Sequence, residues 1–178
     1  MEIMKKNIII SGVVSGSIAL LISVPLFAQA LKGHNSNAPV DVDADHIEVQ
    51  DRADRAIFAG NVRVRQEGLA LNAQRLTVAY NKVNGTPQIE RLDAQGGVVV
   101  TSADQAAHGD VAIYDLNRRL ITMVGGVELQ QGSNTIHGNR LVIDLVSGRS
   151  IVDGSAAGGA SGGGGRVSGH FTVQQRKP

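Results

Sequence analysis

The chain lacks cysteine altogether and has little aromatic character and little proline. Its 178 residues include no Cys, no Trp and only 4 Pro, and aromatic residues make up 3%. Without Cys there are no disulfides and no thiol chemistry, so core packing and hydrogen bonds must hold the fold. Because large aromatic side chains are scarce, the core must consist of Val, Leu, Ile and Ala, a composition that favours strands.

An excess of charge of one sign is also missing. The chain has 17 Lys and Arg residues against 16 Asp and Glu residues. Nucleic-acid binding needs a clustered basic surface, and single-strand binding also needs aromatic rings on which bases stack. The sequence offers neither, so we expect no nucleic-acid partner.

Long hydrophobic runs are missing except at the N-terminus. Two lysines precede an apolar stretch at 8–27, and the small-residue pattern Ala-Gln-Ala follows at 28–30. This order predicts an export signal peptide over residues 1–30, and Pro25, just before the Ala-Gln-Ala site, favours cleavage. The apolar stretch is also long enough to cross a bilayer, so a retained membrane anchor is the alternative.

Downstream of the apolar stretch the pattern changes to strict alternation. After a flexible lead-in over 31–39, apolar and polar residues alternate with period two, which is typical of half-buried strands. The sequence therefore predicts an all-β domain over 40–153. A Gly-rich flexible segment over 154–165 and a last strand with a C-terminal tail over 166–178 are expected to follow.

A unit of two strands repeats about three times within this domain. Glycine, then Gly or Asn, then Val-x-Val or Val-x-Leu occurs at 60–64, 96–100 and 125–129. We expect the glycines to form turns between strands. In each unit a small residue follows the valine by 11 residues and begins another strand: Val62 to Ala73, Val98 to Gly109, and Val127 to Gly138. Such repeats predict stacked strands that bury their apolar faces on one another.

One unit contains extra residues with a turn signal of their own. Asn84-Gly85 lies between two alternating segments, and this dipeptide predicts a two-residue hairpin turn.

No pattern predicts a catalytic or metal site. The stretch DVDAD begins like a calcium loop, but His46 and Arg52 stand where the loop needs Gly and an acidic residue. His108 and His137 occupy equivalent places in two repeat units, and the third unit has Asn there, so we expect surface turn positions. No nucleophile elbow or phosphate-binding loop is present. We therefore expect neither an enzyme nor a cofactor.

The inward face of the strands is the remaining candidate site. Alternation predicts the following inner lining: Val40, Val42, Ile47, Val49, Val62, Val64, Leu76, Val78, Val98, Val100, Tyr114, Leu116, Val127, Leu129, Leu141 and Ile143. These side chains either pack a closed core or line an apolar groove in a slightly open sandwich, and periodicity does not distinguish the two.

The ordered series of motifs resembles the OstA-like family. DADHIEV is followed by FAGNVRV and NAQRLTV, and later by HGDVAIYDL, LITMVGGVEL and IHGNRLVIDL, together covering roughly 40–152. The resemblance implies a slightly open antiparallel β-jelly-roll of about 12–16 strands. It also implies a periplasmic protein that binds lipopolysaccharide and carries its acyl chains in a hydrophobic groove for outer-membrane assembly. Acyl-facing residues implied by the family are Val40 and Val42 near one end, and Val100, Tyr114 and Leu116 in the middle.

The same resemblance implies partners. Members of the family stack head to tail and bridge an LptC-like inner-membrane protein and an LptD-like outer-membrane protein. Two alternatives stay open. One is an inner-membrane-anchored, LptC-like relay of the same fold that keeps residues 1–30; the other is a purely structural stacking protein with a closed core.

Overall fold

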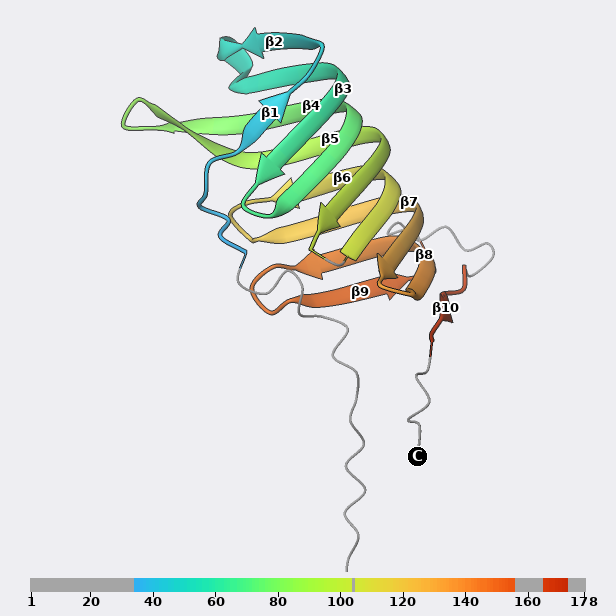
Figure 1. Cartoon of the computed structure of the whole chain (residues 1–178). Coiled ribbons are helices and arrows are strands. Elements are labelled where there is room, and N and C mark those ends of the chain that lie inside the picture. The colour runs from blue at the N-terminus through green and yellow to red at the C-terminus, as the bar shows by residue number, and fades with distance from the viewer. Residues whose placement is uncertain (1–33, 104, 156–164, 173–178) are drawn as a thin grey trace, which may run out of the picture.

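The computed structural model describes residues 34–103, 105–155 and 165–172, and they form one antiparallel sheet of ten strands (Figure 1). The expected signal peptide, part of the lead-in, most of the Gly-rich segment and most of the C-terminal tail lie outside these residues. The strands are β1 (Asp41–Asp43), β2 (His46–Gln50), β3 (Arg55–Gln66), β4 (Leu69–Val83), β5 (Thr86–Ser102), β6 (Gln105–Asp115), β7 (Leu120–Gln131), β8 (Asn134–Asp144), β9 (Arg149–Asp153) and β10 (Ser168–His170). A short 3-10 helix, η1 (Asp51–Ala53), joins β2 to β3. Among the described residues, no helix has the length and hydrophobicity that a membrane span requires.

Consecutive strands pair from β3 to β8, so the sheet is a meander. At one end β1 and β2 both pair with β3, and at the other end β9 and β10 both pair with β8. The expected hairpin turn lies between β4 and β5, where Val83 pairs with Thr86. Both turn residues have positive φ, 52° at Asn84 and 79° at Gly85, as a type I′ turn requires. The all-β antiparallel prediction is confirmed.

The repeated glycine motifs bend continuous strands instead of separating them, so the expected glycine turns between strands were wrong. The 11-residue spacing joins direct cross-strand partners: Val62 with Ala73, Val98 with Gly109, and Val127 with Gly138. Next to each pair the register shifts, because two residues of one strand face a single residue of the next. Such a bulge bends the strand and keeps the ladder on both sides of it. We call these positions the corners.

The corners fold the sheet into two facing halves, visible as two layers in Figure 1. Half-sheet A consists of segments 46–50, 55–59, 75–83, 86–95, 111–115, 120–124, 140–144 and 149–153. Half-sheet B consists of segments 41–43, 62–66, 69–73, 98–102, 105–109, 127–131, 134–138 and 168–170. The ten strands thus contribute sixteen segments, because six of them cross a corner. Counted as segments, they agree with the number that the resemblance implies.

The core lies between the two halves. Leu76, Met123 and Leu141 have no exposed surface, and they belong to one cluster of buried apolar side chains drawn from both halves. Burial of these faces against each other is the main force that holds the halves together. The fold therefore places a continuous apolar interior between two layers.

The last two strands together replace one bent strand. Asp153 pairs with Arg140, as Val124 does on the other side of β8, so Gly154 occupies the same place as the corner residue Gly125. The Asn139 Nδ2 group donates a hydrogen bond of 2.5 Å to the Gly154 carbonyl. Beyond the Gly-rich segment, β10 resumes the pairing along β8. The described chain thus leaves the edge of β8 at a corner position, Gly154, and returns to that edge at β10.

Candidate functional site

Most of the predicted inner lining is buried between the half-sheets. The buried members are Val62, Val64, Leu76, Val78, Val98, Val100, Tyr114, Val127, Leu129, Leu141 and Ile143. Three further members are half-buried and pack against this cluster: Val40, Val42 and Leu116. Alternation with period two therefore identified the inward face correctly along six strands.

Two predicted lining residues on β2 differ from this pattern. The exposed fractions of Ile47 and Val49 are 52% and 62%. Ile47 pairs with Phe58, and Phe58 pairs with the buried Leu76, so Ile47 does lie on the inner face. It is exposed because β2 is the end strand of half-sheet A and no described segment covers it.

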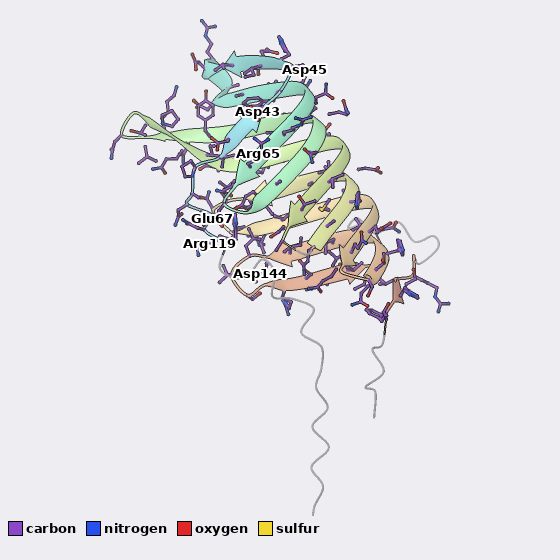
Figure 2. The ribbon with its side chains drawn as sticks, in the orientation of Figure 1. Asp43, Asp45, Arg65, Glu67, Arg119 and Asp144 are labelled. Carbon is purple, nitrogen blue, oxygen red and sulfur yellow. The ribbon has the colours of Figure 1, made fainter. Side chains whose placement is uncertain are left out.

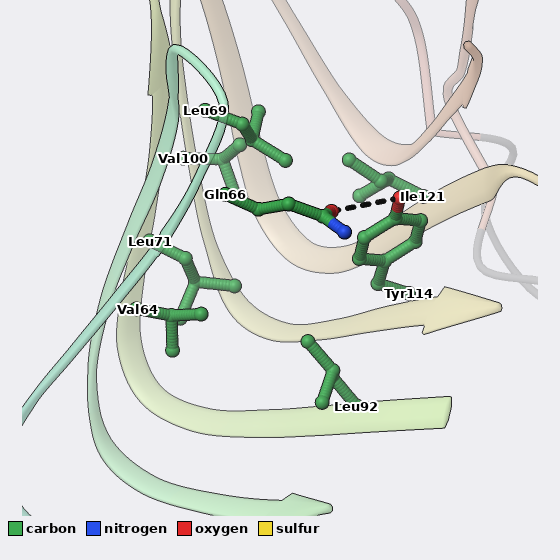
Figure 3. Close-up of a pocket in the computed structure, with 8 residues that line it drawn as sticks. All are labelled: Val64, Gln66, Leu69, Leu71, Leu92, Val100, Tyr114 and Ile121. Atoms are coloured by element: carbon green, nitrogen blue, oxygen red, sulfur yellow. Dashed lines mark hydrogen bonds between the residues drawn. The ribbon is translucent and has the colours of Figure 1, made fainter. Parts of the chain in front are cut away.

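The interior is tightly packed and contains a small cavity, midway along the strand order between β3 and β7 (Figure 3). The cavity measures about 20 Å³, which is room for about one water molecule. Its lining draws on both half-sheets: Val64, Gln66, Leu69, Leu71, Leu92, Val100, Tyr114 and Ile121. In this conformation the apolar interior is therefore closed, and a ligand of lipid size would fit only if the halves separated.

Two polar side chains meet inside this apolar lining. Gln66, at the end of β3 in half-sheet B, is 3% exposed, and Tyr114, near the end of β6 in half-sheet A, is 4% exposed. The Tyr114 hydroxyl donates a hydrogen bond of 3.1 Å to Gln66 Oε1 (Figure 3). Burial raises the pKa of Tyr114 above its ordinary value, and the nearby Ser36 hydroxyl and Arg119 charge oppose this rise. The two half-sheets are thus joined by a neutral hydrogen bond on the side opposite the corners.

The segment that precedes β1 lies against this pair. We call residues 34–40 the N-terminal strap; it runs past the strand ends opposite the corners (Figure 1). Gln66 Nε2 donates to the carbonyls of Ser36 at 3.1 Å and Ala38 at 2.9 Å, and His34 Nε2 donates to Gln66 Oε1 at 3.1 Å. With Tyr114 these contacts use the full capacity of the Gln66 amide, two donated and two accepted bonds.

Sequence reasoning missed Gln66, although a signal for it exists. Val62, Val64 and Gln66 follow one another with period two, so Gln66 occupies an inward position. A polar residue at such a position needs hydrogen-bond partners inside the fold. The sequence does not reveal that those partners are the N-terminal strap and Tyr114.

The charged motifs of the sequence lie on the outer surface. Asp43 forms an ion pair of 3.1 Å with Arg65, and Asp45 accepts a hydrogen bond of 2.7 Å from Asn61 (Figure 2). These contacts are those of a solvated strand face, as expected. Figure 2 also shows Glu67 and Arg119 at the strand ends on the side of the strap.

The two repeat-unit histidines lie within strands and not in turns, contrary to expectation. His108 on β6 and His137 on β8 flank Glu128 on β7, and His137 Nδ1 is 3.7 Å from Glu128 Oε2. Among the residues with a described placement, no group of three or more His, Cys, Asp or Glu side chains is arranged to hold a metal ion.

Both ends of the sheet expose strand edges. In the described part of the chain, β1 and β2 pair only with β3, and β9 and β10 pair only with β8. No described strand pairs with their outer edges, where backbone N–H and C=O groups can bond to an added strand.

This chain is similar to known proteins in sequence. The family model described as "LptA/(LptD N-terminal domain) LPS transport protein" matches residues 41–149. An uncharacterized protein of Rhizobium meliloti (strain 1021), R00383, is 30% identical over 176 residues, covering 92% of this chain and 90% of the relative.

A solved structure has the same fold. The crystal structure of LptH from Pseudomonas aeruginosa, described as the LptA-homologous periplasmic component of the lipopolysaccharide transport device, superposes with a TM-score of 0.67. It is 18% identical in sequence, and the match covers 78% of this chain and 98% of LptH. The family match spans most of the sheet, from β1 to the start of β9. The chain therefore belongs to the LptA/LptD N-terminal domain family of lipopolysaccharide transport proteins.

Proposed function

We propose that this protein is a periplasmic carrier that binds lipopolysaccharide and shields its acyl chains between the two half-sheets. The observation that carries the proposal is the continuous apolar interior, lined from both halves and free of charged side chains at its central cavity. Burying one methylene is worth about 0.8 kcal/mol, so an acyl chain in water is costly by several kcal/mol. Passage through an aqueous compartment therefore needs an apolar shield and no reaction.

The bent strands supply a physical means of opening. Because the closed interior has room for about one water molecule, binding requires the halves to move apart on the side opposite the corners. The corners join the halves through single strands with local bulges, and these are positions where a sheet changes direction without losing its ladder. We expect the sheet to open by splaying about the corners.

The exposed end strands support a bridging role. A second copy, an LptC-like inner-membrane protein or an LptD-like outer-membrane protein would add a strand at β1 and β2 or at β9 and β10. Head-to-tail addition would align the apolar interiors of successive copies. Ile47 and Val49, exposed on the inner face of the end strand, would then become buried.

The location follows from the expected signal peptide. Cleavage after residue 30 releases the domain into the periplasm, whereas retention would give the LptC-like relay. The mass of the protein in a periplasmic extract distinguishes the two, because only cleavage yields a free chain that starts near residue 31.

Site-specific photo-crosslinking tests lipid binding. A photoreactive residue replaces Val100, which is buried in the interior, and in a matched variant it replaces Val99, the adjacent residue on the outer face. After irradiation with purified lipopolysaccharide, we expect an adduct at position 100 and none at position 99. If neither position reacts, or if both react equally, the interior is only a core and the carrier function is refuted.

A further inference from the structure

We propose that the N-terminal strap (residues 34–40) is a gate that keeps the apolar interior closed, and that Gln66 holds this gate shut. The inference rests on the proposed function and adds a control step to it. Lipid enters only after the strap has been displaced from Gln66.

Gln66 connects three separate pieces of the molecule. The side chain originates in half-sheet B, it accepts a hydrogen bond from Tyr114 of half-sheet A, and its three other bonds involve His34, Ser36 and Ala38 of the strap. Separating the halves breaks the bond to Tyr114, and lifting the strap breaks the other three. Opening of the interior and release of the strap therefore act on one amide group.

Because the Gln66 amide is buried, breaking only some of its hydrogen bonds is unfavourable. Gln66 is 3% exposed and borders the central cavity, whose other lining is apolar apart from Tyr114. A buried amide that loses one partner keeps the cost of desolvation and gains nothing in return. The bonds are therefore expected to break together, with Gln66 turning toward water or an incoming polar group. This makes closed and open two distinct states.

The strap itself can leave without damage to the sheet. Its backbone hydrogen bonds are local, from Ser36 N to the His34 carbonyl at 3.1 Å and from Ala38 N to the Asn35 carbonyl at 3.0 Å. It forms no ladder with a strand, since the pairing of β1 with β3 begins at Asp41. Displacement thus costs the contacts to Gln66 and the packing of Val40 on the core cluster, and it leaves the strand ladders intact.

Hydrogen exchange tests the gate on the mature chain. We expect purified lipopolysaccharide to increase exchange of peptides covering 34–40 in the wild-type protein. Gln66→Leu, which keeps the volume and removes the hydrogen bonds, should increase this exchange without lipid. It should also speed adduct formation at a photoreactive residue at Val100 by at least about tenfold, the factor expected from losing one of the four buried hydrogen bonds of Gln66.

Gln105→Leu is the matched control. Gln105 is also buried, at the start of β6, but it borders the neighbouring small cavity with Leu129 and Ile143 instead of the strap. Gln105→Leu also replaces a buried amide by an apolar side chain. If its adduct rate equals that of wild type, the faster rate of Gln66→Leu comes from release of the strap.

The outcomes separate the gate from the carrier function. If adducts form at position 100 while lipid leaves strap exchange unchanged, and both glutamine variants react at the wild-type rate, the gate is overturned and the carrier stands. If no adduct forms even in a chain that begins at Asp41, where the strap is absent, the proposed function fails and the gate with it.

Discussion

The second corner offers a sharp test of how the sheet is bent, because its two glycines differ in their surroundings. Gly96 has φ of +85°, and a Cβ atom placed there would lie 2.8 Å from Gln74 Cβ and 3.1 Å from Gln74 Cγ. Gly97 has φ of +59°, and a Cβ atom placed there would meet no atom within 4 Å. The equivalent of Gly97 in the first corner is Asn61, which adopts φ of 46°. We expect Gly96→Ala to be far more damaging than Gly97→Ala.

The magnitudes follow from these distances. At Gly97 a side chain bears only the cost of the left-handed region, about 1–2 kcal/mol, partly offset by about 0.4–1 kcal/mol from a less flexible unfolded chain. Gly97→Ala should therefore lower the free energy of unfolding by about 1 kcal/mol. At Gly96 backbone strain of about 1–3 kcal/mol adds to overpacking of similar size, so Gly96→Ala should cost about 2–6 kcal/mol.

Urea unfolding of the mature chain, followed by circular dichroism, measures both variants. A domain stabilised by about 5–15 kcal/mol should tolerate Gly97→Ala and lose a large part of its stability with Gly96→Ala. Equal losses would refute the argument, because they would mean that contact with Gln74 does not restrict the corner. A larger loss for Gly97→Ala would contradict the φ values themselves.

Three further predictions concern the core and two titrating groups. Leu76→Ala should lower the free energy of unfolding by about 2–5 kcal/mol, because Leu76 is fully buried. Ile47→Ala, on the same inner face but exposed, should lower it by less than about 1 kcal/mol. Similar urea midpoints for the two variants would show that the interior is not a packed core. Burial raises the pKa of Tyr114, so its stabilising contribution is full below the unfolded pKa of about 10 and is lost as pH rises through the folded pKa. The difference in the free energy of unfolding between wild type and Tyr114→Phe should therefore shrink above about pH 10. A difference that stays constant with pH would contradict this. Hydrogen bonds from Ser147 and Val146 lower the pKa of Asp144, so its contribution to stability is present above about pH 4 and is lost as pH falls through the folded pKa. Asp144→Ala should therefore be less stable than wild type at pH 7 and equally stable at low pH. An undiminished difference in stability at pH 2 would exclude this role.

Local rules were sufficient for much of the fold. Asn84-Gly85 forms the expected turn, because two adjacent residues with positive φ are a local requirement that Asn and Gly meet. The inward face was identified along β3 to β8, because side chains of a strand alternate regardless of what lies opposite. Local rules failed for the glycine motifs. A β-bulge and a turn both favour glycine with positive φ, and they differ only in how the flanking segments pair with other strands.

Residues at the ends and in the interior show where local rules stop. Ile47 lies on the predicted face but is exposed, because burial depends on whether a segment of the other half-sheet covers it. Gln66 reads as one polar residue in an apolar series, and its partners are 28 to 48 residues away in sequence. Such contacts are set by the fold and cannot be read from spacing.

The sequence by itself determined the class of fold, the repeat and the apolar inward face, because strand periodicity and glycine placement act over a few residues. It left open whether that face is a closed core or a groove. The tertiary structure decided that the corners fold one sheet into two layers, that the interior is closed, and that Gln66 joins both layers to the strap. These depend on which distant segments face each other, since burial and hydrogen-bond satisfaction are properties of pairs of surfaces and not of a single strand.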